Sequence, residues 1–124
     1  MEDLIRIGAA ASALGVSIDT LRRWERDGRV AFERRSGQRF VPAAELTRLL
    51  TERAGTSRSS ARNRFTGTVI SVKRDEVMAQ VEIACGDQRI VSLMSRESAD
   101  QLDLKPGVTA SAVIKATTVI VERP

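Results

Sequence analysis

The sequence has no histidine and no tyrosine, and Cys85 is its single cysteine. Without histidine, the chain lacks the most common metal ligand and the most common general base of enzymes. One thiol can form neither an intrachain disulfide nor a thiolate metal cluster. A glycine-rich phosphate loop of Walker spacing is also missing. An enzyme is therefore the least expected class, and we expect no metal held as a free cation and no organic cofactor.

Aromatic residues and long apolar runs are scarce too. Valine, isoleucine, leucine and alanine must therefore build the core of this 124-residue chain, which could form one domain or two small ones. Small cores of this kind are often stabilised by oligomerisation. No segment resembles a signal peptide or reaches the length of a membrane span, so we expect a cytoplasmic protein without a membrane partner. The aromatic residues are Trp24, Phe32, Phe40 and Phe65.

The positive charge is concentrated in the first half of the chain. Residues 1–59 carry 11 arginines, no lysine and 8 acidic residues, whereas residues 60–124 carry 9 basic and 8 acidic residues. Guanidinium groups suit phosphates and base edges better than lysine does. Charge alone would fit an ordinary basic surface equally well.

The first half begins with two predicted helices. Residues 7–14 form the first, and Gly15 ends it. Ser17 is a good N-cap for the second, over residues 18–27, which ends at Gly28. The second helix has an apolar stripe and an arginine-rich outer face, which could enter a major groove. Taken alone, an ordinary helical hairpin with solvated charges fits equally well.

A basic hairpin and a third helix follow. Residues 30–34 and 39–41 alternate like strands around a turn, and Pro42 opens a helix over residues 43–50. This order of elements predicts a winged helix-turn-helix that binds double-stranded DNA. The candidate DNA-binding residues are Ser17, Thr20, Arg22, Arg23 and Arg26 on the second helix, and Arg34, Arg35 and Arg39 on the wing.

This half resembles the MerR-like and excisionase-like DNA-binding domains. The resemblance rests on residues 10–17, on Thr20-Leu21-Arg22-Arg23-Trp24-Glu25 with Gly28, and on Arg39-Phe40-Val41. It implies that Trp24 lies in the core and that Arg22 and Arg23 contact DNA. The long dimerising coiled coil that follows many MerR-type domains is missing here, so the resemblance leaves dimerisation to another part of the chain.

The second half reads as a separate β domain. Polar residues 52–59 predict a flexible linker between a domain over residues 1–51 and another over 60–124. The expected fold is therefore α+β with two domains, the second being a five-stranded OB-like barrel with one short helix. Its strands are expected at residues 65–73, 77–84, 88–94, 108–115 and 118–122, and its helix runs from an N-cap at Ser95 to Leu102.

Cations and hydroxyls gather at the predicted strand ends. Ser95 and Ser98 lie at a helix N-terminus, where free N–H groups favour an anion. Arg62 and Lys115 add positive charge, and Ser60 adds a hydroxyl donor. Each also has an ordinary explanation, because Ser95 can be a cap, Lys115 can be solvated and Arg62 can pair with a carboxylate.

Two short runs resemble the Mop family of molbindin domains. The first is Ser60-Ala61-Arg62-Asn63 with Gly67, and the second covers residues 113–117. The resemblance implies that Ser60, Arg62, Lys115 and the backbone N–H of Ala116 contact an oxyanion. It implies further that Ser95 and Ser98 complete a site from a neighbouring chain. A single Mop unit then requires a homo-oligomer, for which the resemblance favours a hexamer arranged as a trimer of dimers.

Together the two halves predict a transcription regulator that senses molybdate or tungstate at subunit interfaces and binds DNA. Both ligands are dianions, which arginine, lysine and N–H donors stabilise through charge-assisted hydrogen bonds. The alternative is an intracellular molybdate storage protein with an accessory helix-turn-helix. A nucleic-acid-binding OB module is less well supported, because base stacking needs aromatic residues, which are scarce in the second half.

Overall fold

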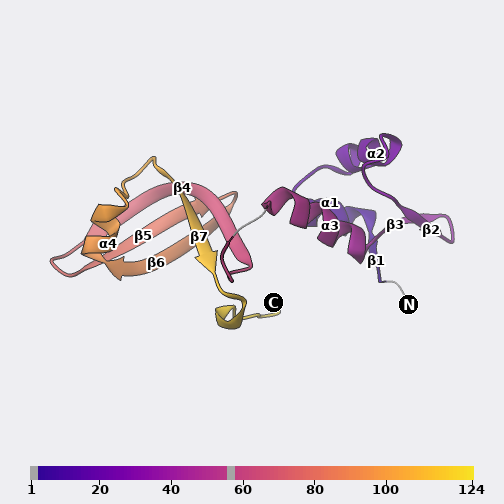
Figure 1. Ribbon diagram of the computed structural model, residues 1–124. Helices are drawn as coiled ribbons and strands as arrows, with labels where there is room; N and C mark the ends of the chain where they lie inside the picture. Colours follow the sequence, from indigo (N-terminus) through magenta and orange to yellow (C-terminus); the bar gives the residue numbers. More distant parts are fainter. Residues whose placement is uncertain (1–2, 56–57) are drawn as a thin grey trace. The chain divides into compact units, whose positions relative to one another are not determined.

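The computed structural model describes residues 3–55 and 58–124 and is shown in Figure 1. The chain divides into two compact units, an N-terminal unit of residues 1–57 and a C-terminal unit of residues 58–124. Thr56 and Ser57 of the predicted linker lie outside the described residues. No helix in the described part of the chain has the length and apolar character needed to cross a membrane.

The N-terminal unit contains three helices and a small antiparallel sheet, in the predicted order of helix, turn, helix, hairpin and helix (Figure 1). The sheet order is β1-β3-β2, so that β3 pairs with a strand on each side. The first strand was not predicted from the sequence, and the last helix extends four residues beyond the predicted end at residue 50. The elements are β1 (Leu4–Arg6), α1 (Ile7–Leu14), α2 (Ile18–Arg26), β2 (Glu33–Arg35), β3 (Gln38–Pro42) and α3 (Ala43–Ala54).

Local signals place these helices. Gly15 adopts the left-handed conformation, with a φ of 68°, and closes α1. The Ser17 side chain accepts a hydrogen bond from the Thr20 backbone N–H at 3.1 Å, as expected of an N-cap. The core is aliphatic, and Leu21 and Val41 are fully buried in it. Trp24 packs against this core while the Arg29 guanidinium lies over its ring, 4.5 Å from the centroid.

The C-terminal unit is a half-barrel of four antiparallel strands in the order β6-β5-β4-β7 (Figure 1). The strand β4 is shared, because residues 63–68 pair with β7 and residues 68–74 pair with β5. The elements are β4 (Asn63–Arg74), β5 (Met78–Cys85), β6 (Gln88–Ser95), α4 (Arg96–Gln101), β7 (Thr109–Ile114) and the 3₁₀ turn η1 (Ala116–Thr118).

The prediction of a fifth strand at residues 118–122 is wrong. Thr118 instead ends η1, and residues 119–121 pair with no strand of the described chain. The β-branched pattern that favoured a strand is present, but a strand also needs a free neighbouring edge. The bend at η1 carries the chain off the β4–β7 ladder, so Ile120 and Val121 remain 87% and 86% exposed.

Two carboxylates, Asp75 and Glu82, support a turn and a strand pairing of this sheet. The backbone N–H groups of Met78 and Val77 donate to Oδ1 of Asp75 at 2.7 and 2.8 Å, and these bonds hold the pKa of that carboxyl below its ordinary value. The Arg89 guanidinium donates to both oxygens of Glu82, which lowers the pKa of Glu82 in the same way. The carboxylates therefore favour the folded sheet in their ionised form.

Gly67 lies where β4 passes closest to β5. A Cβ atom at this position would lie 2.0 Å from the Ala84 carbonyl oxygen and 2.8 Å from Sγ of Cys85. Both neighbours belong to the strand that β4 must pair with, and the backbone oxygen cannot move aside. Only glycine permits this close approach.

We therefore expect Gly67→Ala to lower the free energy of unfolding of the C-terminal unit by about 1–3 kcal/mol or more, because it overpacks against backbone. Urea unfolding followed by circular dichroism measures the change. The control is Thr68→Ala at the next, exposed position, which should cost less than about 1 kcal/mol. Equal losses in the two variants would contradict the close approach at Gly67.

Candidate functional site

The two Mop-like runs meet at one end of the β4–β7 ladder. Asn63 and Ile114 are partners in the register, although they are 51 residues apart in the sequence. The side-chain amide of Asn63 also donates to the Ile114 carbonyl oxygen at 3.2 Å. Arg62 immediately precedes this pair and Lys115 immediately follows it. The pairing therefore brings both cations to the same end of the sheet within one protomer.

Neither cation is neutralised by the described chain. Arg62 is exposed, and its guanidinium donates to the backbone oxygens of Ser59 and Ala61 at 3.1 and 3.3 Å. Lys115 is exposed as well, and no ion pair among the described residues involves either side chain. The ordinary explanation that Arg62 pairs with a carboxylate is thus not what the described residues show.

Hydrogen-bond donors accompany these cations. Ser60 is exposed beside Arg62, and the Ala116 backbone N–H donates to no oxygen in the described contacts. Thr118, for which the sequence suggested no role, donates through both its backbone N–H and Oγ1 to the Lys115 carbonyl oxygen, at 3.0 and 2.8 Å. This clamp fixes the bend that presents the Ala116 N–H. Asn63 belongs to the first Mop-like run, but neither it nor Thr118 was expected to contact the ligand, and the hydrogen bonds of both indicate positioning residues.

Ser95 and Ser98 lie elsewhere in the same protomer. Ser95 is the N-cap of α4, where its Oγ accepts from the Ser98 N–H at 3.1 Å and donates to the Ser98 hydroxyl at 2.8 Å. Ser95 ends β6 and pairs with Met78, so it lies near the far end of β4 from Asn63. Figure 1 shows α4 and η1 at opposite ends of the half-barrel. A single protomer does not bring these serines to the two cations.

The predicted DNA-binding residues lie on α2, its N-cap and the hairpin, and all are exposed except Thr20 and Arg39, which are half-buried. The hydroxyls of Ser17 and Thr20 bond to each other at 2.9 Å in the helix cap. Arg35 bonds to Glu33, and Arg22 lies 4.0 Å from the exposed Asp19. The remaining predicted residues, Arg23, Arg26, Arg34 and Arg39, have no ion pair within the described part of the chain.

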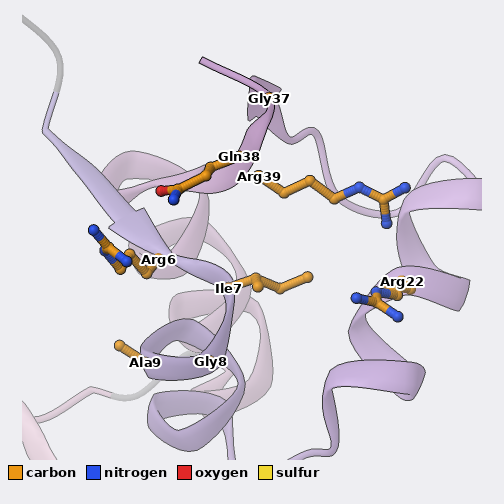
Figure 2. A pocket seen from close by; sticks show the side chains of 8 residues that line it. All are labelled: Arg6, Ile7, Gly8, Ala9, Arg22, Gly37, Gln38 and Arg39. Carbon is orange, nitrogen blue, oxygen red and sulfur yellow. The ribbon is translucent and has the colours of Figure 1, made fainter. Parts of the chain in front are cut away.

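A cleft of about 670 Å³ lies among these elements, lined by three arginines and by no acidic residue (Figure 2). Arg22 and Arg39 were expected from the sequence, but Arg6 was not. Arg6 is the last residue of β1, a strand too short to show a periodic pattern in the sequence.

Residues 59–121 match the family model for the TOBE domain. The chain belongs to the TOBE-domain family. Residues 6–40 match a second model, described as the MerR family regulatory protein, so the helix-turn-helix resemblance of the N-terminal unit is confirmed. The two matches fall on different units, which makes this chain a MerR-type region joined to a TOBE, or Mop-type, domain.

Named relatives match about half of this chain. Molybdenum-pterin-binding protein 3 of Clostridium pasteurianum is 44% identical over 64 residues, which cover 50% of this chain and 93% of that protein. Molybdenum transport protein ModE of Herbaspirillum seropedicae is 36% identical over 64 residues, which cover 51% of this chain but 24% of that protein. These names describe binding and transport proteins rather than enzymes.

A solved structure supports the half-barrel. The molybdate binding protein from Sporomusa ovata superimposes with a TM-score of 0.52 at 30% identity, covering 54% of this chain and 100% of that chain. A Mop-type unit of this size can therefore constitute a whole protein chain, and the MerR-type region of this chain is an addition to it.

Proposed function

We propose that this protein is a cytoplasmic, molybdate- or tungstate-binding transcription regulator that binds DNA through its N-terminal unit. The observation that carries the proposal is the convergence of Arg62 and Lys115 at the end of the β4–β7 ladder, with no acidic partner among the described residues. The names of the relatives, which mention molybdenum-pterin, molybdenum and molybdate, support this class of ligand.

A tetrahedral dianion suits this arrangement. Bringing a dianion out of water is costly unless charged partners and hydrogen-bond donors replace its hydration. Arg62 and Lys115 supply two positive charges, while Ser60 and the Ala116 N–H supply neutral donors. Such charge-assisted hydrogen bonds are about twice as strong as neutral ones. The set fits a small divalent oxyanion without any metal cation.

A second copy of the chain is proposed to complete the site. A cleft of about 270 Å³ in the C-terminal unit is lined mainly by apolar residues of β5, β6 and β7, including Val81, Met94 and Val113. Val119, Ile120 and Val121 are apolar and exposed in the same protomer. Exposed apolar patches are typical of association surfaces, and so are outer strands of a sheet, which here are β6 and β7. The proposed assembly is a hexamer built as a trimer of dimers.

This assembly would give Ser95 and Ser98 their predicted role. The two serines lie far from Arg62 and Lys115 in one protomer, so a neighbouring copy must supply them if they contact the ligand. An oxyanion shared in this way stabilises the assembly by mass action. Ligand binding would then set the spacing of the DNA-binding units, which is the proposed regulatory step.

A storage protein is the second candidate. The observation in its favour is that relatives and structures consisting almost wholly of the Mop-type unit exist, since the matches cover 93% and 100% of two of them. Oxyanion binding therefore has no obvious need for the N-terminal unit. In this alternative the helix-turn-helix is an accessory, and DNA binding plays no part in the function.

We expect Lys115→Ala to weaken molybdate binding by about 10- to 100-fold, since hydrogen bonds to charged groups contribute about 1.5–3 kcal/mol. Isothermal titration calorimetry on the full chain measures the loss, with sulfate titrated in parallel. Lys105→Ala is the control, because Lys105 is also exposed and lies outside the candidate site. A wild-type protein that gives no heat with millimolar molybdate would overturn the ligand assignment.

A DNA-binding experiment distinguishes the two candidate functions, transcription regulator and storage protein. We expect a duplex carrying the gene's own upstream sequence to bind the protein more tightly than a duplex of mixed sequence, with an affinity that changes when molybdate is added. Gel-shift titrations at several salt concentrations measure both effects. Sequence-independent binding that ignores molybdate would favour the storage protein.

The association surface has its own test. We expect Ile120→Asp to dissociate the assembly into smaller species, because it places a charge in an apolar contact. Light scattering after size-exclusion chromatography gives the mass of each species. Glu122→Gln, two residues further along, is the control and should leave the mass unchanged. A wild-type protein that is monomeric at every concentration, with and without molybdate, would contradict the proposed oligomer.

A further inference from the structure

We infer that the cleft between the N-terminal end of α1, helix α2 and the hairpin seats the phosphodiester backbone of DNA, and that Arg6 is one of its contacts. This inference rests on the proposed DNA-binding function and adds Arg6 and the first turn of α1 to the residues predicted from the winged helix-turn-helix pattern. The cleft draws its lining from β1, α1, α2 and the hairpin, and its charged side chains are Arg6, Arg22 and Arg39.

The electrostatics of the cleft favour a polyanion. None of the residues that line it is acidic. Arg6 and Arg39 have no ion pair with any described residue. The guanidinium of Arg22 lies 4.0 Å from a carboxylate oxygen of the exposed Asp19. Arg39 also lies directly across the β2–β3 ladder from Arg34, which is an unfavourable pairing of like charges. An anion placed in the cleft would relieve this repulsion.

The backbone at the floor of the cleft adds donors. The first turn of α1, residues 7–9, lines it, and neither a capping side chain nor an acidic residue occupies that turn. Free N–H groups at such a position attract phosphate. Gly8 has no side chain to cover them, and a Cβ atom there would meet nothing closer than Ile18 Cδ1 at 4.0 Å. This helix end reinforces a site whose main charge comes from the three arginines.

The size and layout of the cleft distinguish a DNA strand from a small ion. Its volume is about 670 Å³, whereas a water molecule takes about 30 Å³ in the liquid, so a single tetrahedral ion would leave most of the cleft filled with water. Figure 2 shows Arg22 and Arg39 reaching toward each other on one side of Ile7, with Arg6 and Gln38 on the other side. Two separate cationic ends suit a chain of phosphates.

The test uses the full-length protein and a fluorescently labelled duplex of mixed sequence, with anisotropy measured over a range of salt concentrations. We expect Arg6→Gln to reduce the slope of log K against log salt by about 1, and to weaken binding roughly five- to tenfold at 0.1 M salt, as the loss of one phosphate contact does. Arg6→Lys, which retains the charge, should retain the slope.

The control is Arg58→Gln, which removes the same charge from an exposed residue that does not line the cleft. An equal loss of slope in Arg6→Gln and Arg58→Gln would mean that net charge alone acts, and would overturn the inference. A wild-type protein that binds DNA with a steep salt dependence, together with an unchanged slope in Arg6→Gln, would overturn the inference and leave the proposed function standing. A wild-type protein that binds no duplex at low salt would overturn both.

A final experiment with inorganic phosphate tests whether the cleft is instead a site for a small anion. If phosphate raised the melting temperature of the wild-type protein but not of Arg6→Gln, while the two bound DNA with the same slope, the cleft would be a small-anion site and the inference would be wrong. The result expected is an Arg6-dependent salt slope with DNA, whatever stabilisation phosphate provides. Thermal unfolding without ligand confirms that each variant is folded.

Discussion

The antiparallel pairing of β4 with β7 is the interaction on which the candidate oxyanion site depends. It joins Asn63 to Ile114 across a separation of 51 residues and so places two local sequence runs beside each other. Closing so long a loop costs conformational entropy, which the many hydrogen bonds of the sheet repay. Any ligand that bridges the two runs must therefore also stabilise this non-local ladder.

Arginines that form ion pairs and arginines that form none with the described residues occur in both units. In the C-terminal unit Arg89 pairs with Glu82 at 2.7 Å and Arg74 pairs with Asp100 at 3.1 Å. The described cations without such pairs include those at the candidate oxyanion site. In the N-terminal unit Arg48 pairs with Glu45 and Glu52, whereas Arg6 and Arg39, which form no ion pair with the described residues, line a cleft without a carboxylate. Surface pairs of the first kind add little stability, whereas unpaired cations create a field that attracts anions.

The sequence predicted the elements whose signals are local. Ser17 and Ser95 are caps in both the sequence and the structure, and the strands around the turn at Asp75 follow the expected alternation. The wrong fifth strand shows the limit of such signals, because strand formation depends on an available partner edge. The strand β1 was not predicted, because three residues are too few to show an alternating pattern. Arg6, its last residue, was therefore not predicted as a functional residue either. The oxyanion residues came from a resemblance of motifs, and only the β4–β7 register explains why those motifs belong together.

The opposite placement of the candidate residues along β4 has a consequence for stoichiometry. If Ser95 and Ser98 complete a site begun by Arg62 and Lys115 of another copy, then each chain carries two complementary half-sites that cannot satisfy each other. In any closed, symmetric ring or cage, every first half then meets one second half, and the complex holds one ion per chain regardless of its size. An isolated protomer, by contrast, would hold only incomplete sites, so occupancy itself would report that the ring has closed.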